Sequence, residues 1–168
     1  GFSGFSFLEA KVDLQSLAAK YAEYQIAQRR WFHAHPEVSG KEFETSAHIK
    51  SELDRMGIAW RVCGLETGIA AKIQGKAPGK TIMLRADMDA LSVKEETGES
   101  FASLNEGVMH ACGHDCHMSM LLTAAAMLNE LKDSFNGTVV LAFQPSEEMG
   151  SGAKSMIENG VLEGVDAA

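Results

Sequence analysis

The stretch Thr138-Val-Val-Leu-Ala-Phe143 is almost continuously apolar, which is typical of a strand that is buried on both faces of a sheet. A second run, Thr81-Ile-Met-Leu-Arg-Ala86, has the same character and predicts another strand buried on both faces. Shorter apolar runs at 59–62 and 68–74 predict two further strands, and a turn at 76–80 separates the second of them from Thr81. These segments predict the sheet.

Helical patterns surround the predicted strands. Residues 11–34 carry apolar side chains largely at helical spacing, and 118–131 is so apolar that it predicts a buried helix. Ser39-Gly-Lys-Glu42 has the pattern of a capping box, in which the two side chains satisfy each other's backbone donors. It predicts a helix over 40–56 that ends at Gly57.

The order of these elements, with a last helix over 152–159, predicts an α/β sheet with helices on both faces. Residues 164–168 have the pattern of another strand, so we expect the sheet of this chain to be incomplete. We expect residues 11–168 to belong to one domain. Residues 1–10 are apolar but too short for a signal peptide, and we expect a disordered arm or an appended segment there.

Composition excludes some classes of protein. The 168 residues include 15 basic and 23 acidic side chains, a formal charge of −8, which argues against a nucleic-acid binder because such proteins need a basic surface. No run of 18 apolar residues is present, so we expect no membrane span. The three cysteines cannot all pair, which favours a reducing, cytoplasmic setting.

Chemically active side chains follow two of the strands and precede the buried helix. They are Asp87 and Asp89 after 81–86, Cys112 and His114 before 118–131, and Glu147 and Glu148 after 138–143. In layered α/β folds the loops at the carboxyl ends of strands meet at one edge of the sheet, so we expect these groups to converge. A thiolate, an imidazole and a carboxylate are good ligands for a zinc-like ion, and a second carboxylate can act as a general base.

Two other hypotheses use the same cluster. A structural zinc site would take Cys112, His114, Cys116 and His117 as its four ligands, but so short a segment wraps poorly around a tetrahedral ion. A nucleophilic Cys112, activated by His110 or His114, would need an oxyanion hole that no feature of the sequence indicates. It would also leave Glu147 and Glu148 without a role.

Four motifs together resemble the M20 metallopeptidase family. They are His35-Pro-Glu-Val-Ser39, the stretch from Leu84 to Leu91 (LRADMDAL), Met109-His-Ala-Cys-Gly-His-Asp115 and Phe143-Gln-Pro-Ser-Glu-Glu148. The closer resemblance is to the amidohydrolase branch, which includes aminoacylases, hippurate hydrolases and plant auxin-conjugate hydrolases. It implies a three-layer α-β-α, zinc-peptidase-like sheet. The chain is expected to be the N-terminal portion of the catalytic domain, without the lid or dimerisation domain.

The resemblance also implies roles for individual residues. Cys112 would bridge two divalent metal ions, most often manganese or zinc, while His114 would bind one ion and Glu148 the other. Glu147 would be the general base, and Asp87 would orient a ligand. In addition, Asp115 is expected to cap the following helix, and His110 to pack in the loop rather than bind metal.

The implied reaction is hydrolysis of the amide bond of N-acyl amino acids by a metal-activated water. The family pattern has two more histidine ligands, which are expected to lie beyond residue 168. A second hypothesis is therefore a catalytically silent fragment, and a third is a metal-binding or interaction module. An unfinished sheet would expose an edge strand, so we expect a homo-oligomer or self-association through that edge.

Overall fold

The structure of the chain is a computed structural model that describes residues 13–168. The prediction for 1–10 and the first two positions of the predicted 11–34 helix therefore lie outside the described residues. The elements, in order, are α1 (Leu14–Ala34), α2 (Phe43–Met56), β1 (Trp60–Val62), β2 (Ile69–Gln74), β3 (Thr81–Asp87), α3 (His114–Glu130), the 3-10 turn η1 (Lys132–Ser134), β4 (Thr138–Gln144) and α4 (Gly152–Glu158). This is the predicted order of helices and strands.

The four strands form one mixed sheet in the order β1-β2-β4-β3. β4 pairs in parallel with β3 and antiparallel with β2, and it is buried from its second residue onward, as predicted. The prediction that 81–86 is buried on both faces is wrong, since Ile82 is 42% exposed. β3 is one of the two outer strands of the described sheet and pairs with a neighbouring strand on one side only.

The predicted strand over 164–168 is reduced to a single bridge. Ala167 pairs in parallel with Ile82, and the carbonyl oxygen of Ala167 accepts a hydrogen bond of 2.8 Å from the amide of Met83. The carboxylate of Asp166 also accepts a bond of 2.8 Å from the amide of Thr81. Residues 166–167 therefore lie along the outer edge of β3, beside the first residues of that strand.

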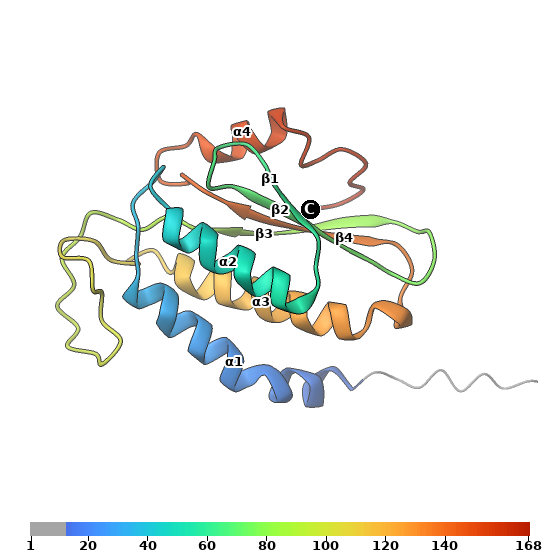
Figure 1. The fold of residues 1–168 in the computed structure, drawn as a ribbon, viewed down its shortest axis with the longest axis horizontal. Coiled ribbons are helices and arrows are strands. Elements are labelled where there is room, and N and C mark those ends of the chain that lie inside the picture. Colours follow the sequence, from blue (N-terminus) through green and yellow to red (C-terminus); the bar gives the residue numbers. More distant parts are fainter. Residues whose placement is uncertain (1–12) are drawn as a thin grey trace, which may run out of the picture.

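The helices cover both faces of the sheet, which confirms the three-layer α-β-α fold (Figure 1). α2 and α3 lie on one face, α1 packs against the outer side of α3, and α4 lies on the opposite face. The larger buried cluster fills the first interface and includes Phe32, Ile49, Leu53, Ile69, Met118, Leu122, Leu141 and Phe143. A smaller cluster under α4 includes Cys63, Val140, Ala142 and Met156.

The start of α2 differs from the predicted capping box. Glu37 provides the cap, because its carboxylate accepts hydrogen bonds from the amides of Glu44 at 3.0 Å and Thr45 at 2.7 Å. Ser39 instead donates its hydroxyl to Asp89 at 2.6 Å, and α2 begins at Phe43 rather than at residue 40. The predicted end is confirmed, because Gly57 terminates the helix in the left-handed conformation with a φ of 69°.

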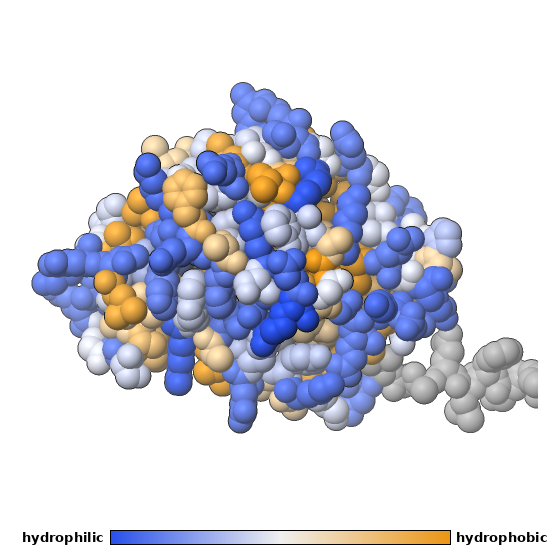
Figure 2. Space-filling model, viewed as in Figure 1, coloured by the Kyte–Doolittle hydropathy of each residue, from blue (hydrophilic) through white to orange (hydrophobic). Residues whose placement is uncertain are grey.

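The surface seen from the same side is mainly hydrophilic, with hydrophobic side chains in small separate groups (Figure 2). None of the helices in residues 13–168 combines the length and the apolar character that crossing a bilayer requires.

Candidate metal centre

The predicted clusters converge at the edge of the sheet where β3 and β4 end. The register of the two parallel strands places Asp87 beside Gln144, so the residues that follow each strand meet. Ligand atoms of Cys112, His114 and Glu148 all lie within 4.8 Å of one another. The sequence-predicted ligands therefore form one group that could hold a metal ion.

His114 is buried and presents one ring nitrogen to this group. Its Nδ1 donates to the backbone oxygen of Asp89 at 2.7 Å, which leaves Nε2 facing Asp87 at 3.5 Å and both Glu147 and Glu148 at 3.8 Å. Burial lowers the pKa of His114, but the hydrogen bond to Asp89 and the charge of Asp87 outweigh it and raise the pKa to about 9. A cation at Nε2 would displace that proton and balance the surrounding carboxylates.

Cys112 is exposed beside Glu148. The hydrogen bond to Glu148, burial and the nearby carboxylates raise the pKa of its thiol above the usual range. A nucleophilic cysteine needs a lowered pKa, so this environment argues against a Cys112 nucleophile and suits a thiolate that forms only with a cation. The structural zinc hypothesis also lacks support, because Cys116 belongs to no potential metal-ligand group of the described residues.

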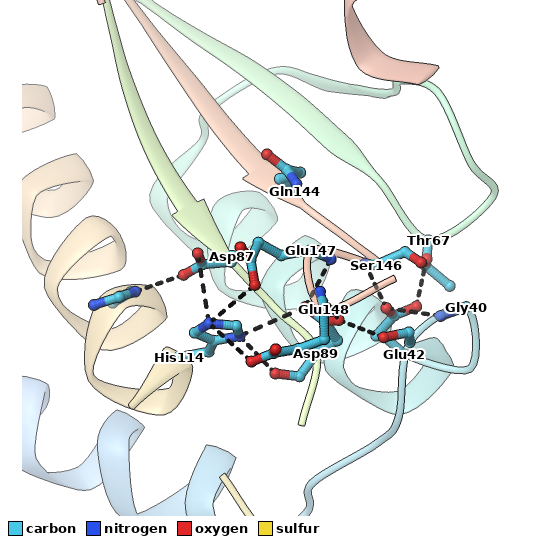
Figure 3. A network of polar contacts seen from close by, with 12 residues as sticks. Gly40, Glu42, Thr67, Asp87, Asp89, His114, Gln144, Ser146, Glu147 and Glu148 are labelled. Carbon is cyan, nitrogen blue, oxygen red and sulfur yellow. Dashed lines mark hydrogen bonds and ion pairs between the residues drawn. The ribbon is translucent and has the colours of Figure 1, made fainter. Parts of the chain in front are cut away.

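Asp89 connects the three loops of the centre (Figure 3). Its buried carboxylate accepts hydrogen bonds of 3.0 Å from the amides of Glu147 and Glu148, and its backbone oxygen fixes His114. Burial raises the pKa of Asp89, but hydrogen bonds from His114, Ser39 and the two amides outweigh it and hold the pKa well below its usual range. The sequence indicated only that Asp89 follows a strand.

Asp87 contacts two histidines and an arginine. His117 Nδ1 donates to its Oδ1 at 2.5 Å, and Arg85 lies 3.3 Å from its Oδ2. The Asp87 carboxylate lies beside Nε2 of His114, the nitrogen that faces the site. The backbone oxygen of Asp89 accepts a hydrogen bond from the other nitrogen, Nδ1. Asp87, His114 and His117 also form a second group of potential ligand atoms within 4.8 Å, so His117, which the sequence offered only as a ligand of a structural zinc, is a candidate residue of this centre.

The loop that carries the paired glutamates is tightly fixed. Ser146 has a φ of 53°, which is unusual for a residue other than glycine, and its amide donates to the buried carboxylate of Glu42 at 2.8 Å. Glu42 also accepts bonds from Gly40 at 2.9 Å and Thr67 at 3.0 Å. This buried carboxylate therefore ties the start of α2 and the β1–β2 loop to the end of β4 (Figure 3).

Gly152 allows this loop to close. A Cβ at this position would lie 1.6 Å from the carbonyl oxygen of Pro145. We expect Gly152→Ala to lower the free energy of unfolding by about 1–3 kcal/mol, the usual cost of overpacking a closed site. Urea unfolding would measure the loss. The exposed Lys154→Ala on the same helix is the control and should change stability by no more than about 0.5 kcal/mol. Equal stability of the two variants would contradict the expectation.

Asp115 does not cap α3 as expected. α3 begins at His114 with Gly113 at the cap position, so Asp115 lies within the first turn. Its carboxylate accepts a bond of 2.9 Å from the amide of Cys116 and one of 2.7 Å from His33. Asp115 therefore joins the helix start to α1 rather than capping the helix.

His110 is buried, as expected of a packing residue, and belongs to neither potential metal-ligand group. Burial, the largest influence, lowers its pKa to about 4, so the ring is neutral near pH 7. Neither ring nitrogen has a hydrogen-bond partner among residues 13–168.

A layered α/β sheet whose edge brings a thiol, a buried imidazole and two carboxylates together defines a candidate metal-dependent hydrolase. The family model described as "Peptidase family M20/M25/M40" matches residues 83–168, and the chain belongs to this family.

Similar proteins of known description support this assignment. The chain is 51% identical over 142 residues to an N-acetyl-L-cysteine deacetylase of Bacillus subtilis, covering 84% of this chain and 34% of the relative. It is 49% identical over 147 residues to thermostable carboxypeptidase 1 of Saccharolobus solfataricus, covering 86% of this chain and 37% of the relative. The chain thus spans about a third of the length of these relatives.

A solved structure agrees with the fold. A dinuclear metal-binding peptidase of the M20 family from Bacillus subtilis superposes with a TM-score of 0.84 at 42% identity, covering 88% of this chain and 41% of the other. The donor atoms found here fit a divalent metal, because sulfur, nitrogen and oxygen ligands face one another while a neighbouring carboxylate remains free.

Proposed function

We propose that the protein is a metal-dependent hydrolase that cleaves the amide bond of N-acyl amino acids. One observation carries the proposal: the ligand atoms of Cys112, His114 and Glu148 converge, with the carboxylate of Glu147 3.8 Å from His114 Nε2. We expect two divalent ions, manganese or zinc, which Cys112, His114 and Glu148 would help to hold.

Each residue has a distinct task in this proposal. Bound divalent ions would supply Lewis acidity and lower the pKa of water. Glu147, whose side chain is 40% exposed and outside the ligand group, would accept a proton from water and return it to the leaving nitrogen. Asp87 would keep His114 and His117 in place beside the reacting groups.

The relatives favour this class of substrate. A deacetylase of an N-acetylated amino acid cleaves an amide between an acyl group and an amino acid. A carboxypeptidase releases a C-terminal amino acid, so the bond that it cleaves also joins an acyl group to an amino acid. The shared feature is an amide nitrogen that belongs to an amino acid with a free carboxylate, and we propose this feature as the substrate class.

We expect metal removal to abolish hydrolysis reversibly. The protein in its natural length should release amino acids from N-acetyl-methionine and hippurate, lose activity in a chelator and regain it with Mn²⁺ or Zn²⁺. Released amine and bound metal, measured on the same samples, check this expectation. Stoichiometric metal binding without release of any amino acid would favour a metal-binding module. Hydrolysis that persists after complete metal removal would contradict the proposal.

Two further predictions concern the setting of the protein. Cys63, Cys112 and Cys116 are all free thiols, which favours a reducing compartment such as the cytoplasm. Self-association through the outer edge of β3 stays a prediction, since the bridge to Ala167 covers only the first residues of that strand.

A further inference from the structure

We propose that His33 is a positioning residue for the metal-binding loop Cys112–His114 and acts on it through Asp115. His33 lies on α1, in the layer outside α3, and its imidazole is only 4% exposed. The inference rests on the proposed metal site, but it concerns residues that contact none of the expected ligand side chains.

The His33 ring lies between two buried carboxylates. Its Nδ1 is 2.7 Å from Oδ2 of Asp115, and its Nε2 is 3.0 Å from Oε1 of Glu95. The side chains of Asp115 and Glu95 are 1% and 5% exposed. Each ring nitrogen therefore has a carboxylate oxygen as its partner. Arg29 Nε lies 3.0 Å from the same Oδ2 of Asp115, so His33 shares this carboxylate with a guanidinium.

The Nδ1 side of the ring controls the start of α3. Asp115 directly follows His114, and its other oxygen accepts the amide hydrogen of Cys116 at 2.9 Å. Gly113, at a φ of 87°, forms the sharp turn between the two expected ligands, and α3 has no side-chain cap. The bond from His33 to Asp115 therefore fixes the first turn of the helix from which His114 projects.

The Nε2 side of the ring holds a segment that carries no expected ligand. Glu95 accepts bonds from the amide of Ser103 at 2.6 Å and the hydroxyl of Thr97 at 2.5 Å. Phe101, from the same segment, packs edge-on against the His33 ring at 5.6 Å. Burial raises the pKa of Glu95, but its hydrogen bonds, those from Thr97 and Ser103 foremost, outweigh it and lower the pKa to about 2. The two nitrogens of His33 thus have separable tasks.

Two substitutions separate these tasks. The side-chain nitrogen of asparagine can occupy the place of Nδ1, and that of glutamine the place of Nε2. We expect His33→Gln, which loses the bond to Asp115, to weaken Co²⁺ binding by about 10–100-fold. The absorption bands of bound Co²⁺ should shift, and amide exchange at Cys116 should become faster. His33→Asn should keep the affinity, the bands and the Cys116 exchange close to those of the wild type, and speed exchange at Ser103 instead.

The same comparison can be made from the carboxylate side. Asp115→Asn should reproduce the effects of His33→Gln, whereas Glu95→Gln should not, so the test does not depend on folding of the His33 variants. All variants are made in the protein at its natural length, with Co²⁺ affinity measured by competition with a chromophoric chelator.

Several outcomes would overturn the inference. One is that His33→Asn and His33→Gln lose the same amount of Co²⁺ affinity, in proportion to their loss of stability. Another is unchanged affinity and Cys116 exchange in His33→Gln. If the wild-type protein bound no Co²⁺, the proposed metal function would fail by itself. Exchange at Cys116 would then still decide whether His33 positions the loop.

Discussion

Replacing Glu147 with glutamine is expected to lower kcat by about 10²–10⁴-fold, the usual contribution of a general base, while the metal content stays unchanged. Glutamine keeps the size and the hydrogen-bonding capacity of the side chain but cannot accept a proton. The Glu147 carboxylate lies outside the group formed by Cys112, His114 and Glu148, so its loss should leave the ligands in place. Initial rates with an N-acetyl amino acid and metal analysis of the same samples would test this.

The neighbouring glutamate supplies the contrast. Glu148→Gln removes an expected ligand, so activity and metal content should fall together. The exposed Glu106→Gln is the matched control for the loss of one negative charge and should retain both. Turnover of Glu147→Gln at the wild-type rate would show that another group takes the proton. Metal loss in this variant would assign Glu147 to the ligands instead.

The sequence predicted the location of the site better than its supporting contacts. Glu148 could be found because it follows the end of an apolar strand, and Cys112 and His114 because they lie in the loop before the buried helix. Asp89 and His33 act through residues that are far from them in sequence. The bond from Glu147 to Asp89 joins residues 58 positions apart, and the bond from His33 to Asp115 joins residues 82 positions apart. No local pattern encodes such pairs.

The wrong local predictions have the same origin. Ser39 and Glu42 matched a capping box, but tertiary partners took both side chains: Asp89 accepts from Ser39, and Glu42 binds the amide of Ser146. A capping motif has alternatives of similar energy, and a buried acceptor or donor elsewhere in the fold competes with the local bond. The apolar run 81–86 likewise predicted a strand correctly, but its place at the edge of the sheet depends on pairing that the run does not specify.

Replacing Asp89 with asparagine is expected to destabilise the protein by about 3–5 kcal/mol, the usual cost of removing one partner of a buried charge pair. Asp89 is 0% exposed and carries a charge beside His114, whose Nδ1 is 3.5 Å from Oδ1. Its two oxygens receive the amides of Glu147 and Glu148 separately. Asparagine would turn an NH₂ group toward one of these amide donors, so at least one hydrogen bond would be lost.

The same substitution should alter the dependence of stability on pH. The folded-state pKa of Asp89 lies below its ordinary value of 3.8, so its carboxylate contributes stability above that pH, and this contribution is lost as the pH falls toward the folded pKa. Asp89→Asn lacks this contribution at every pH, so the stability difference from the wild type should shrink below about pH 4. Urea unfolding of both proteins, from about pH 2 to about pH 7, would measure this difference in stability.

Ser39→Ala provides the control for Asp89→Asn because it removes only one of the hydrogen bonds to the carboxylate, at 2.6 Å. It should cost about 1 kcal/mol, as is usual for a single bond, and leave metal binding intact. Asp89→Asn should in addition weaken Co²⁺ binding by about 10–100-fold, because both the ligand histidine and the glutamate loop lose their support. If Asp89→Asn were no less stable than Ser39→Ala and bound Co²⁺ as tightly, the three loops would be held together by the backbone alone. The buried negative charge would then have no organising role in this site.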